Sequence, residues 1–270
     1  MIRLCKVVRM SRQNYYKQRY YRRRRAVDEE LILSLVRRER AVQPRLGTRK
    51  LLHILGGELK SAGVSVGRDR FFSILGRSSL LIKRRHRGHR TTDSRHRFRV
   101  YGNLLKDFVL TSPHQALVSD ITYIRTDEGF MYLSLVMDAY SRAVVGYDCS
   151  DSLESEGTLR SLTMALRGLP ADGKTIHHSD RGSQYCCCAY VEKLRRRGLR
   201  ISMTEANHCY ENSQAERLNG ILKQEYGLGG RFRSKSDVRR AVREAVTLYN
   251  CRRPHQSLGY RCPMEVHLAA

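Results

Sequence analysis

Three acidic residues stand where a carboxylate is costly unless it is paired or bound to a cation. Asp120 interrupts the apolar run ALVSDITYI, and Asp180 directly follows KTIHHS, which we expect to form a short buried strand. A charge inside a buried strand is unfavourable without a partner. Glu216 falls in the first turns of a helix that we expect to begin at Asn212. Two strands and a helix can bring these carboxylates together, and clustered carboxylate oxygens are typical ligands of hard cations.

Polar side chains near these acids extend the candidate site. Glu216, Asn219 and Lys223 are spaced i, i+3 and i+7, so they share one helix face. A lysine on that face would meet the phosphate of a bound strand, although the face taken alone also fits a solvated surface. Arg181 can pair with a phosphate or with a carboxylate of the site, and Gly182 allows a tight loop.

The role of two further groups of residues has two possible interpretations each. His177 and His178 are either metal ligands or packed structural side chains. Arg252, Arg253 and His255 either contact nucleic acid or form a solvated basic end.

The elements that must position the acids follow from hydrophobic periodicity. We expect strands at 116–125, 130–140, 142–150, 174–180 and 199–204, and helices at 155–168, 185–198, 212–226 and 236–253. Short turns join the first three strands, which predicts an antiparallel meander. Alternating helices and strands follow. This order predicts an α/β layered domain with a mixed sheet.

The first third of the chain has a different pattern. Residues 1–26 mix tyrosines with cationic side chains, and helices are expected at 27–42, at 46–60 with a cap at Thr48, and from Gly67. Two short helices around a glycine-containing turn resemble a helix-turn-helix, with a plain helical bundle as the alternative. Residues 81–100 read as a basic linker. Candidate nucleic-acid contacts here are Arg49, Lys50, Arg68, Arg70, Lys83, Arg84 and Arg85.

The charge of the 270-residue chain is concentrated in that first third. The formal net charge is +25, and residues 1–100 carry 28 Lys and Arg against 7 Asp and Glu, whereas the remainder carries 23 against 19. Such a distribution indicates a polyanionic partner. No apolar run is long enough to span a membrane. The eight cysteines include three in a row and no CxxC, which argues against a disulfide framework or a zinc site and favours a reducing compartment.

Several segments together resemble a known family. VSDITYI, HSDRGSQY and ENSQAERLNGILKQE resemble the DDE motifs of retroviral-integrase-like transposases. The segments YLSLVMDAYSRAVVGY and YNCRRPHQSLGYRCPMEV resemble the second-frame product (OrfB) of the IS-three family of bacterial insertion sequences. The resemblance is strong over residues 110–266 and looser over 1–100. One departure is Glu-Asn-Ser at 211–213, where many relatives have Asp-Asn-Ala.

The resemblance implies a fold and a set of site residues. It implies an RNase H-like mixed-sheet catalytic core at 111–270, a basic linker at 81–110 and an N-terminal all-α, helix-turn-helix-like DNA-binding region at 1–80. Asp120, Asp180 and Glu216 match the catalytic and metal-binding triad, and Lys223 matches the basic residue seven positions after the glutamate. The HHCC zinc module of retroviral integrases is absent from the sequence, so we expect folding without zinc.

It also implies an activity. Two Mg²⁺ ions, or Mn²⁺ in their place, would support cleavage of the element ends and strand transfer, with no nucleotide cofactor. A covalent protein–DNA intermediate is not needed, so Tyr123 and Tyr185 are not expected to be nucleophiles. Expected partners are terminal inverted repeats and target DNA, the upstream first-frame (OrfA) protein or a fusion with it, and further copies of this chain. The expected location is the bacterial cytoplasm, at the nucleoid.

Two other functions remain open at this point. The first is an RNase H-like nuclease that acts on RNA–DNA hybrids, although such an enzyme has no use for the basic first third. The second is a DNA-binding regulator that has lost its chemistry, although the three acids are intact.

Overall fold

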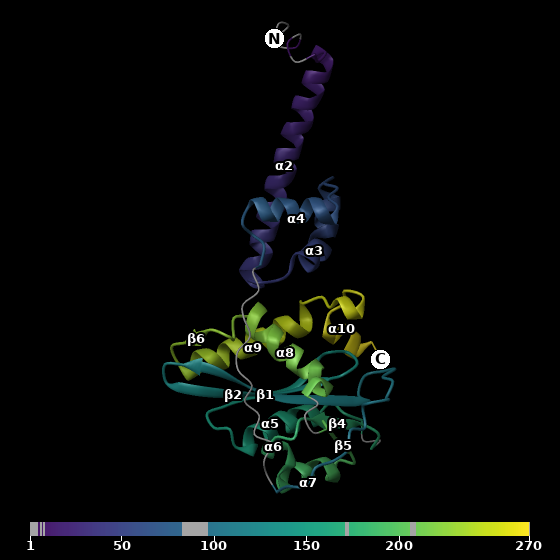
Figure 1. Ribbon diagram of the computed structural model, residues 1–270, viewed down its shortest axis with the longest axis vertical. Helices are drawn as coiled ribbons and strands as arrows, with labels where there is room; N and C mark the ends of the chain where they lie inside the picture. The colour runs from purple at the N-terminus through teal and green to yellow at the C-terminus, as the bar shows by residue number, and fades with distance from the viewer. Residues whose placement is uncertain are drawn as a thin grey trace. The chain divides into compact units, whose positions relative to one another are not determined.

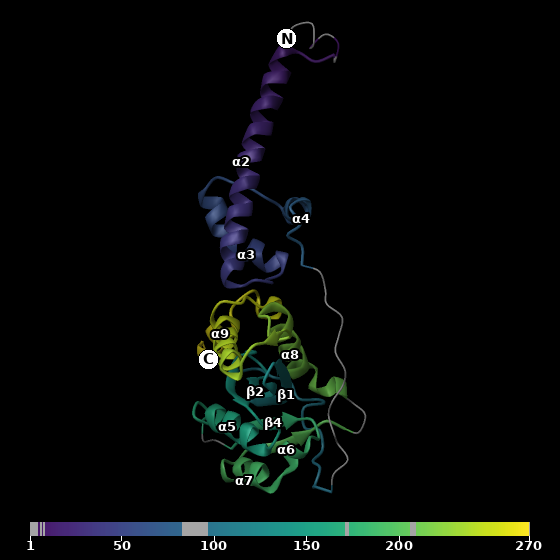
Figure 2. The same cartoon turned by 90° about the vertical axis from the view of Figure 1, so that its left-hand side faces the viewer.

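The computed structural model describes residue 5, residue 7 and the ranges 9–82, 97–170, 173–205 and 209–269. The chain divides into two compact units, Met1–Lys83 and Arg84–Ala270. Figures 1 and 2 show the helices and strands of each unit. None of the helices in the described ranges combines the length and the apolar character needed to traverse a bilayer.

The first unit is helical, as predicted. Its helices are α2 (Arg12–Val42), α3 (Thr48–Ser61) and α4 (Arg68–Arg77). Apolar side chains of all three form one core, which comprises Ile32, Leu35, Val36, Leu46, Leu51, Leu55, Leu59, Val64, Phe71, Ile74 and Leu75. The core draws only on the second half of α2, and the first half of that helix extends away from α3 and α4 (Figure 1).

Two details of this unit differ from the sequence prediction. Residues 12–42 form one continuous helix, whereas the sequence predicted a helix over 27–42. The predicted cap at Thr48 is wrong, because Gly47 is the N-cap and Thr48 is the first helical residue, with its side chain buried. The turn after α3 contains Gly63 at φ +70°, a left-handed conformation that glycine adopts without steric cost.

The second unit is built on a mixed sheet. Its elements are β1 (Ala116–Thr126), β2 (Gly129–Asp138), β3 (Val144–Ser150), α5 (Ser155–Leu166), β4 (Ile176–Ser179), α6 (Ser183–Cys186), α7 (Cys188–Arg196), β5 (Arg200–Met203), the 3₁₀ helix η1 (Cys209–Asn212), α8 (Ser213–Glu225), β6 (Arg231–Phe232), α9 (Lys235–Cys251), the 3₁₀ helix η2 (Gln256–Leu258) and α10 (Pro263–Leu268). The predicted helix over the three adjacent cysteines is interrupted, because Cys187 is extended between α6 and α7. The sequence prediction missed β6 and α10.

The strand order explains how the acids are positioned. The main path runs β3-β2-β1-β4-β5, and the short β6 also pairs with β1. β1, β2 and β3 are antiparallel neighbours, which confirms the predicted meander, whereas β4 and β5 run parallel to β1. Helices cover both faces, with α8, α9 and α10 on one side and α5, α6 and α7 on the other (Figures 1 and 2). The sheet centre is therefore buried, and β4 ends at Ser179 beside the middle of β1.

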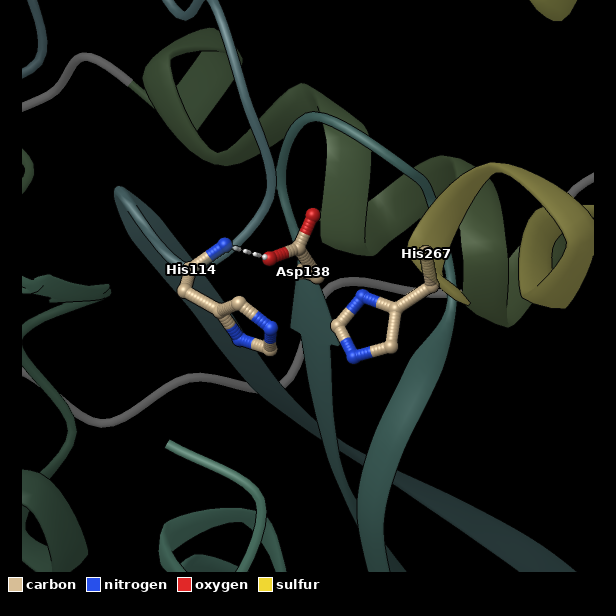
Figure 3. A group of neighbouring side chains, drawn as sticks. All are labelled: His114, Asp138 and His267. Atoms are coloured by element: carbon tan, nitrogen blue, oxygen red, sulfur yellow. Dashed lines mark hydrogen bonds between the residues drawn. The ribbon is translucent and has the colours of Figure 1, made fainter. Parts of the chain in front are cut away.

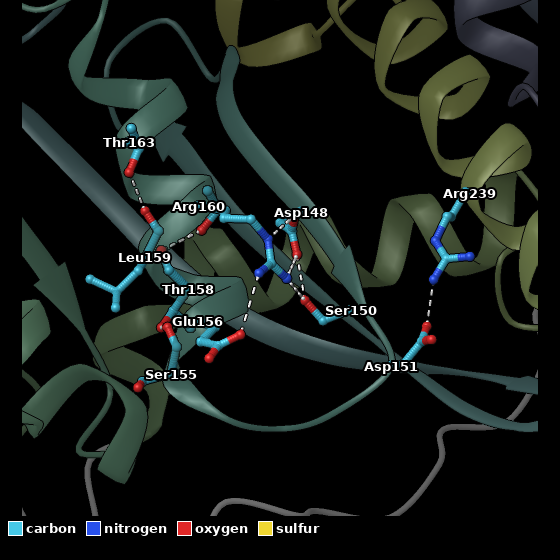
Figure 4. A network of polar contacts seen from close by, with 11 residues as sticks. Asp148, Ser150, Asp151, Ser155, Glu156, Thr158, Leu159, Arg160, Thr163 and Arg239 are labelled. Atoms are coloured by element: carbon cyan, nitrogen blue, oxygen red, sulfur yellow. Dashed lines mark hydrogen bonds and ion pairs between the residues drawn. The ribbon is translucent and has the colours of Figure 1, made fainter.

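The α5 helix is held against the meander by close packing and by charge. Arg160 binds Asp148 and Ser150 of β3, as Figure 4 shows. In the same view Arg239 of α9 pairs with Asp151. A β-carbon built on Gly146 would lie 2.1 Å from the Ser161 carbonyl oxygen, so only glycine permits this approach of helix to strand.

Candidate functional site

The register of neighbouring strands brings Asp120 and Asp180 to the same level of the sheet. β1 and β4 run parallel, and Val118 pairs with His178. Asp120 lies two residues after Val118, still within β1. Asp180 lies two residues after His178, one residue past the end of β4. Side chains two positions apart on a strand point to the same side, so both carboxylates leave the sheet on one face.

Asp120 lies in a crowded acidic environment. Its half-buried carboxylate accepts hydrogen bonds from the Ile121 backbone N–H at 2.9 Å and from Asn219 Nδ2 at 2.8 Å. Burial raises the pKa of Asp120 to about 7, assisted by the nearby charge of Asp180 and, more weakly, by that of Glu216. The two hydrogen bonds oppose this rise but do not cancel it. Because the charges of Asp180 and Glu216 act on Asp120, the three carboxylates lie near one another in the fold.

Asp180 is fixed by the loop that it begins. Its Oδ1 accepts the Gly182 backbone N–H at 3.0 Å, and a β-carbon on Gly182 would lie 3.1 Å from that oxygen. The glycine therefore allows the tight loop that the sequence predicted. Arg181 donates from Nε to the Thr204 carbonyl oxygen at 2.7 Å, which links the loop to the end of β5.

The α8 helix contributes the third acid, as predicted. Glu216 lies exposed in its first turn, and Asn219, one turn further on, makes the hydrogen bond to Asp120. Lys223 is half-buried, and its Nζ lies 4.9 Å from the centre of the Tyr123 ring. Burial lowers the pKa of Lys223, while the charge of Asp120 acts to raise it. Asn219 and Lys223 therefore face β1, and the charge of Glu216 also acts on Asp120.

A buried polar layer lies behind the acids, and only part of it was anticipated. His177 Nε2 lies 2.9 Å from both Ser119 Oγ and Tyr190 Oη. Burial lowers the pKa of His177 to about 3, so the ring is neutral. His178 contacts Ser202 Oγ at 2.8 Å, and burial lowers its pKa to about 4. For His177 these contacts support structural packing, whereas the contact with Ser202 accounts for only one ring nitrogen of His178, since its buried Nε2 has no hydrogen-bond partner among the described residues.

Asn212 and Tyr185 complete this layer, in contacts that the sequence did not predict. Asn212 donates from Nδ2 to the Ser119 carbonyl oxygen at 3.0 Å, which anchors the start of α8 to β1 beside Asp120. Tyr185 is buried, and its hydroxyl has no hydrogen-bond partner among the described residues. The charges of Asp120 and Asp180 contribute to raising its pKa, after burial. The ENS segment at 211–213 was the only sequence signal for Asn212.

Other predicted contacts lie elsewhere. Arg49 and Lys50 lie on α3 and Arg68 and Arg70 on α4, so all four belong to the first unit. Arg49 is exposed, whereas Arg68 pairs with Asp69 and Arg70 lies 3.9 Å from Glu29. Lys83, Arg84 and Arg85 lie outside the described residues.

Both interpretations of the basic C-terminal segment are wrong for two of its members. Arg253 is buried and makes a two-pronged ion pair with Glu225 at 2.7 Å for each contact. His255 is also buried, 2.8 Å from Arg253. Arg252 is exposed. The pattern of charges along the chain did not reveal this ion pair, because its partners lie 28 positions apart on different elements.

Comparisons with known proteins identify the family of the chain. Two family models described as integrase core domain match residues 111–209 and 197–263. A 31 kDa protein of insertion element IS600 from Shigella sonnei is 35% identical over 96% of both chains. Transposase InsF of insertion sequence IS3A from Escherichia coli is 31% identical over 96% of this chain and 91% of its own length.

The chain belongs to the IS3-family transposases. It is a polynucleotidyl transferase with an integrase core domain, as the sequence motifs implied. A chain of the simian T-cell lymphotropic virus intasome, solved with PP2A regulatory subunit B56 gamma, matches with a TM-score of 0.50 and 18% identity over 82% of this chain and 70% of that one. The fold of the transposase is thus RNase H-like, which confirms the predicted mixed-sheet class.

Membership in this family implies dependence on a divalent metal ion, and the transposase has residues that fit one. The donors of the candidate site are carboxylates, the ligands that hard divalent cations prefer. Burial raises the pKa of Asp120, and the charges of Asp180 and Glu216 raise it further, so negative charge accumulates at this site. Beside them, Oδ1 of the buried Asn219 has no hydrogen-bond partner among the described residues. A cation would relieve the repulsion among the three acids.

Proposed function

We propose that this transposase cleaves the ends of its insertion sequence and joins them to target DNA, with Asp120, Asp180 and Glu216 as its catalytic residues. The observation that carries the proposal is the convergence of these acids. Adjacent parallel strands deliver the two aspartates to one level, and a 2.8 Å hydrogen bond from Asn219 ties the helix that bears Glu216 to Asp120.

The three carboxylates would hold two Mg²⁺ ions, or Mn²⁺ in their place. When bound, such ions stabilise the charge that develops on a phosphodiester and lower the pKa of a water or a DNA 3′-hydroxyl. The chain's own residues supply the positioning. Asn219 and the Ile121 N–H orient the carboxylate of Asp120, and the Gly182 N–H orients that of Asp180.

Basic residues around the acids would bind the DNA backbone. Lys223, half-buried against Tyr123, is placed to meet a phosphate beside the acids, and Asn219 and Arg181 flank the same region. Further contacts with the DNA backbone are proposed for basic residues nearer the N-terminus: Arg49, Lys50, Arg68, Arg70, Lys83, Arg84 and Arg85. Phosphate contacts of this kind give an affinity that falls steeply with salt.

The wider assignment follows from the same function. We propose residues 1–80 as a DNA-binding region, 81–110 as a linker and 111–270 as the catalytic core. The DNA partners are terminal inverted repeats and target DNA, and both ends must be held at once, so a homo-oligomer on DNA is expected. Cooperation with an upstream first-frame (OrfA) protein and a location at the bacterial nucleoid complete the proposal.

A plasmid joining assay tests the function. Labelled element ends are incubated with the full chain, supercoiled plasmid and Mg²⁺, and both cleaved and joined products are measured. Asp120→Asn, Asp180→Asn and Glu216→Gln should each lower both products by more than about 1,000-fold, because each removes a charge that holds the cations. The matched control is Asp107→Asn, which neutralises an exposed acid of the same unit and should leave both products unchanged.

Two results would reject the proposal. Cleavage without any joined product would assign the chain to the nucleases. Retention of activity by Asp180→Asn would remove the carboxylates from the chemistry.

A further inference from the structure

A second group of metal-binding side chains lies at the edge of the catalytic unit, apart from the three acids. It comprises His114 in the segment before β1, Asp138 at the end of β2 and His267 on α10, as Figure 3 shows. One ligand atom from each residue lies within 4.8 Å of the other two. Among the described residues, no other group of three histidines, cysteines or acids meets that criterion.

Asp138 anchors this group and keeps one oxygen available. It is fully buried. Its Oδ1 accepts three hydrogen bonds, from the Tyr140 N–H, the Ser141 N–H and the Ser141 hydroxyl, and so caps the turn after β2. Its Oδ2 accepts a single hydrogen bond, from the His114 N–H at 2.7 Å. A carboxylate oxygen has room for a second partner, so Oδ2 can still ligate a cation.

The hydrogen bond of Ser141 sets the tautomer of His267. The Ser141 hydroxyl gives its only proton to Asp138, so it must act as acceptor at His267 Nδ1, 3.1 Å away. Nδ1 therefore carries the hydrogen of the neutral ring, and Nε2 carries the free electron pair. Metal-bound histidines typically use one nitrogen as ligand while the other donates to an oriented oxygen, and the Ser141–Asp138 pair supplies that oxygen.

His114 offers an unused nitrogen. Its Nδ1 is buried and has no hydrogen-bond partner among the described residues. The ring meets that of His267 edge to face, with centroids 4.6 Å apart. The backbone of His114 has φ +67°, an uncommon conformation for a residue with a side chain. A buried polar atom without a partner is costly, so its presence here suggests a ligand.

Space for a further ligand adjoins the two imidazoles. A cavity of about 380 Å³ is lined by both histidines and also by Asn250, Cys251 and Met264. It can admit a water or an anion as the fourth ligand of a tetrahedral ion. Zn²⁺ binds nitrogen and oxygen at about 2 Å, which needs ligand atoms about 3.4 Å apart. The three side chains must therefore draw together on binding, and α10, with only six residues, is a short element that can follow.

We propose that His114, Asp138 and His267 bind one transition-metal ion of the Zn²⁺ class, which clamps α10 to the end of the meander. Two imidazoles and one carboxylate select such an ion over Mg²⁺, which prefers oxygen ligands. The site is separate from the acids proposed for catalysis. Asp138 pairs with Leu117, which lies three residues before Asp120 on β1. The proposed metal site and Asp120 are therefore about 10 Å apart along the strand direction. The clamp stabilises a fold that forms without it.

Co²⁺ is the probe, because it occupies Zn²⁺ sites and absorbs visible light. The full chain, stripped with a chelator and returned to excess Mg²⁺, is titrated with Co²⁺ while its spectrum is recorded. We expect one saturable site with the bands of a tetrahedral nitrogen and oxygen environment. His267→Ala should weaken this site more than about 100-fold, and Ser141→Ala about 10- to 100-fold, since Ser141 only orients a ligand.

Two control variants separate this site from other Co²⁺ ligands. His53→Ala removes an exposed imidazole of the first unit, and Cys251→Ser removes the thiol in the adjoining cavity. Both should leave the Co²⁺ spectrum and affinity unchanged. The proposal is overturned if Co²⁺ finds no saturable site, if His267→Ala binds it as tightly as the unaltered chain, or if Cys251→Ser abolishes binding.

Hydrogen exchange of the same samples tests the clamp. Added Zn²⁺ should slow amide exchange in α10 and in the segment around His114 of the unaltered chain. The same addition should have no effect there in His267→Ala. Equal slowing in both proteins, or none in the unaltered chain, would refute the clamp.

Discussion

Replacing Asp120 by asparagine should stabilise the metal-free transposase, although the same change should abolish its activity. The physical reason is the raised pKa of Asp120, about 7 against an ordinary value of 3.8. The folded state therefore holds a proton on this carboxyl more tightly than the unfolded state does. Stability is lost as the pH rises from about 4 through about 7, and the full cost is present above pH 7.

The magnitude follows from the size of the shift. A change of about 3 pKa units corresponds to about 4 kcal/mol of folding free energy at pH 8, and less than half of that is present at pH 5. Asp120 is only half-buried, so water screens part of the repulsion and about 2 kcal/mol is a more realistic lower figure. Asparagine removes the charge and keeps the shape. Its amide can also donate to the unpartnered Oδ1 of Asn219.

The measurement must report on the catalytic unit alone, because the chain has two units and no tryptophan. The full chain is equilibrated in EDTA with increasing urea at pH 5 or pH 8 and then pulse-labelled by hydrogen exchange at one fixed pH. Peptides from β1 and β2 give the unfolding midpoint. At pH 8 the Asp120→Asn midpoint should exceed that of the unaltered chain by about 1 M urea or more, and at pH 5 by clearly less.

The control and the refutation are direct. Asp107→Asn, an exposed acid of the same unit, should not shift the midpoint at either pH. An Asp120→Asn protein no more stable than the unaltered chain at pH 8 would refute this prediction. The same gain at pH 5 and pH 8 would also refute it, because the effect would then not come from the charge.

Three further variants test the packing of the catalytic unit, each by the urea midpoint of the β1 and β2 peptides. Gly146→Ala should destabilise the catalytic unit by about 3 kcal/mol or more, because the added β-carbon meets the backbone of α5. Gly220→Ala is the control: it lies in open space on α8 and should stabilise the unit by up to about 1 kcal/mol. Equal effects of the two variants would contradict the close approach of α5 to β3. Arg253→Met should cost about 3 kcal/mol by breaking the buried ion pair with Glu225, and Met at both positions should recover most of that; no recovery would show that the arginine acts through packing. Arg160→Ala should cost about 1 kcal/mol or less, because its ion pair with β3 is half-exposed (Figure 4), and a loss above about 2 kcal/mol would refute this.

The strands and the carboxylates could be predicted because their signals are local. An alternating apolar pattern identifies β1 wherever it lies in the fold, and an acid inside it is conspicuous for the same reason. The position of Asp180 after β4 and of Glu216 in the first turn of α8 needed only element boundaries, which glycines and charged residues mark. Family motifs at the same positions then gave these acids their expected role.

Errors arose where the deciding contact is remote in sequence. Thr48 looks like a helix cap, yet its side chain is buried and Gly47 is the N-cap instead. Arg253 looks like part of a solvated basic end, yet Glu225 lies on another element and draws it into the interior. The continuity of α2 also escaped prediction, because a charged, aromatic segment carries no apolar stripe that would show where the helix runs on.

The sequence by itself determined the fold class, the concentration of charge in the first third, and which three acids the RNase H-like core presents. Periodicity, composition and motif are properties of short segments, so they can be read without the fold. Only the tertiary structure decided how those acids influence one another, since the pKa of Asp120 depends on β4 and α8 packing beside β1. It alone assembled His114, Asp138 and His267 from positions more than 100 residues apart at the extremes. Electrostatic coupling and metal coordination act over a few ångströms of space, and chain separation says little about that distance.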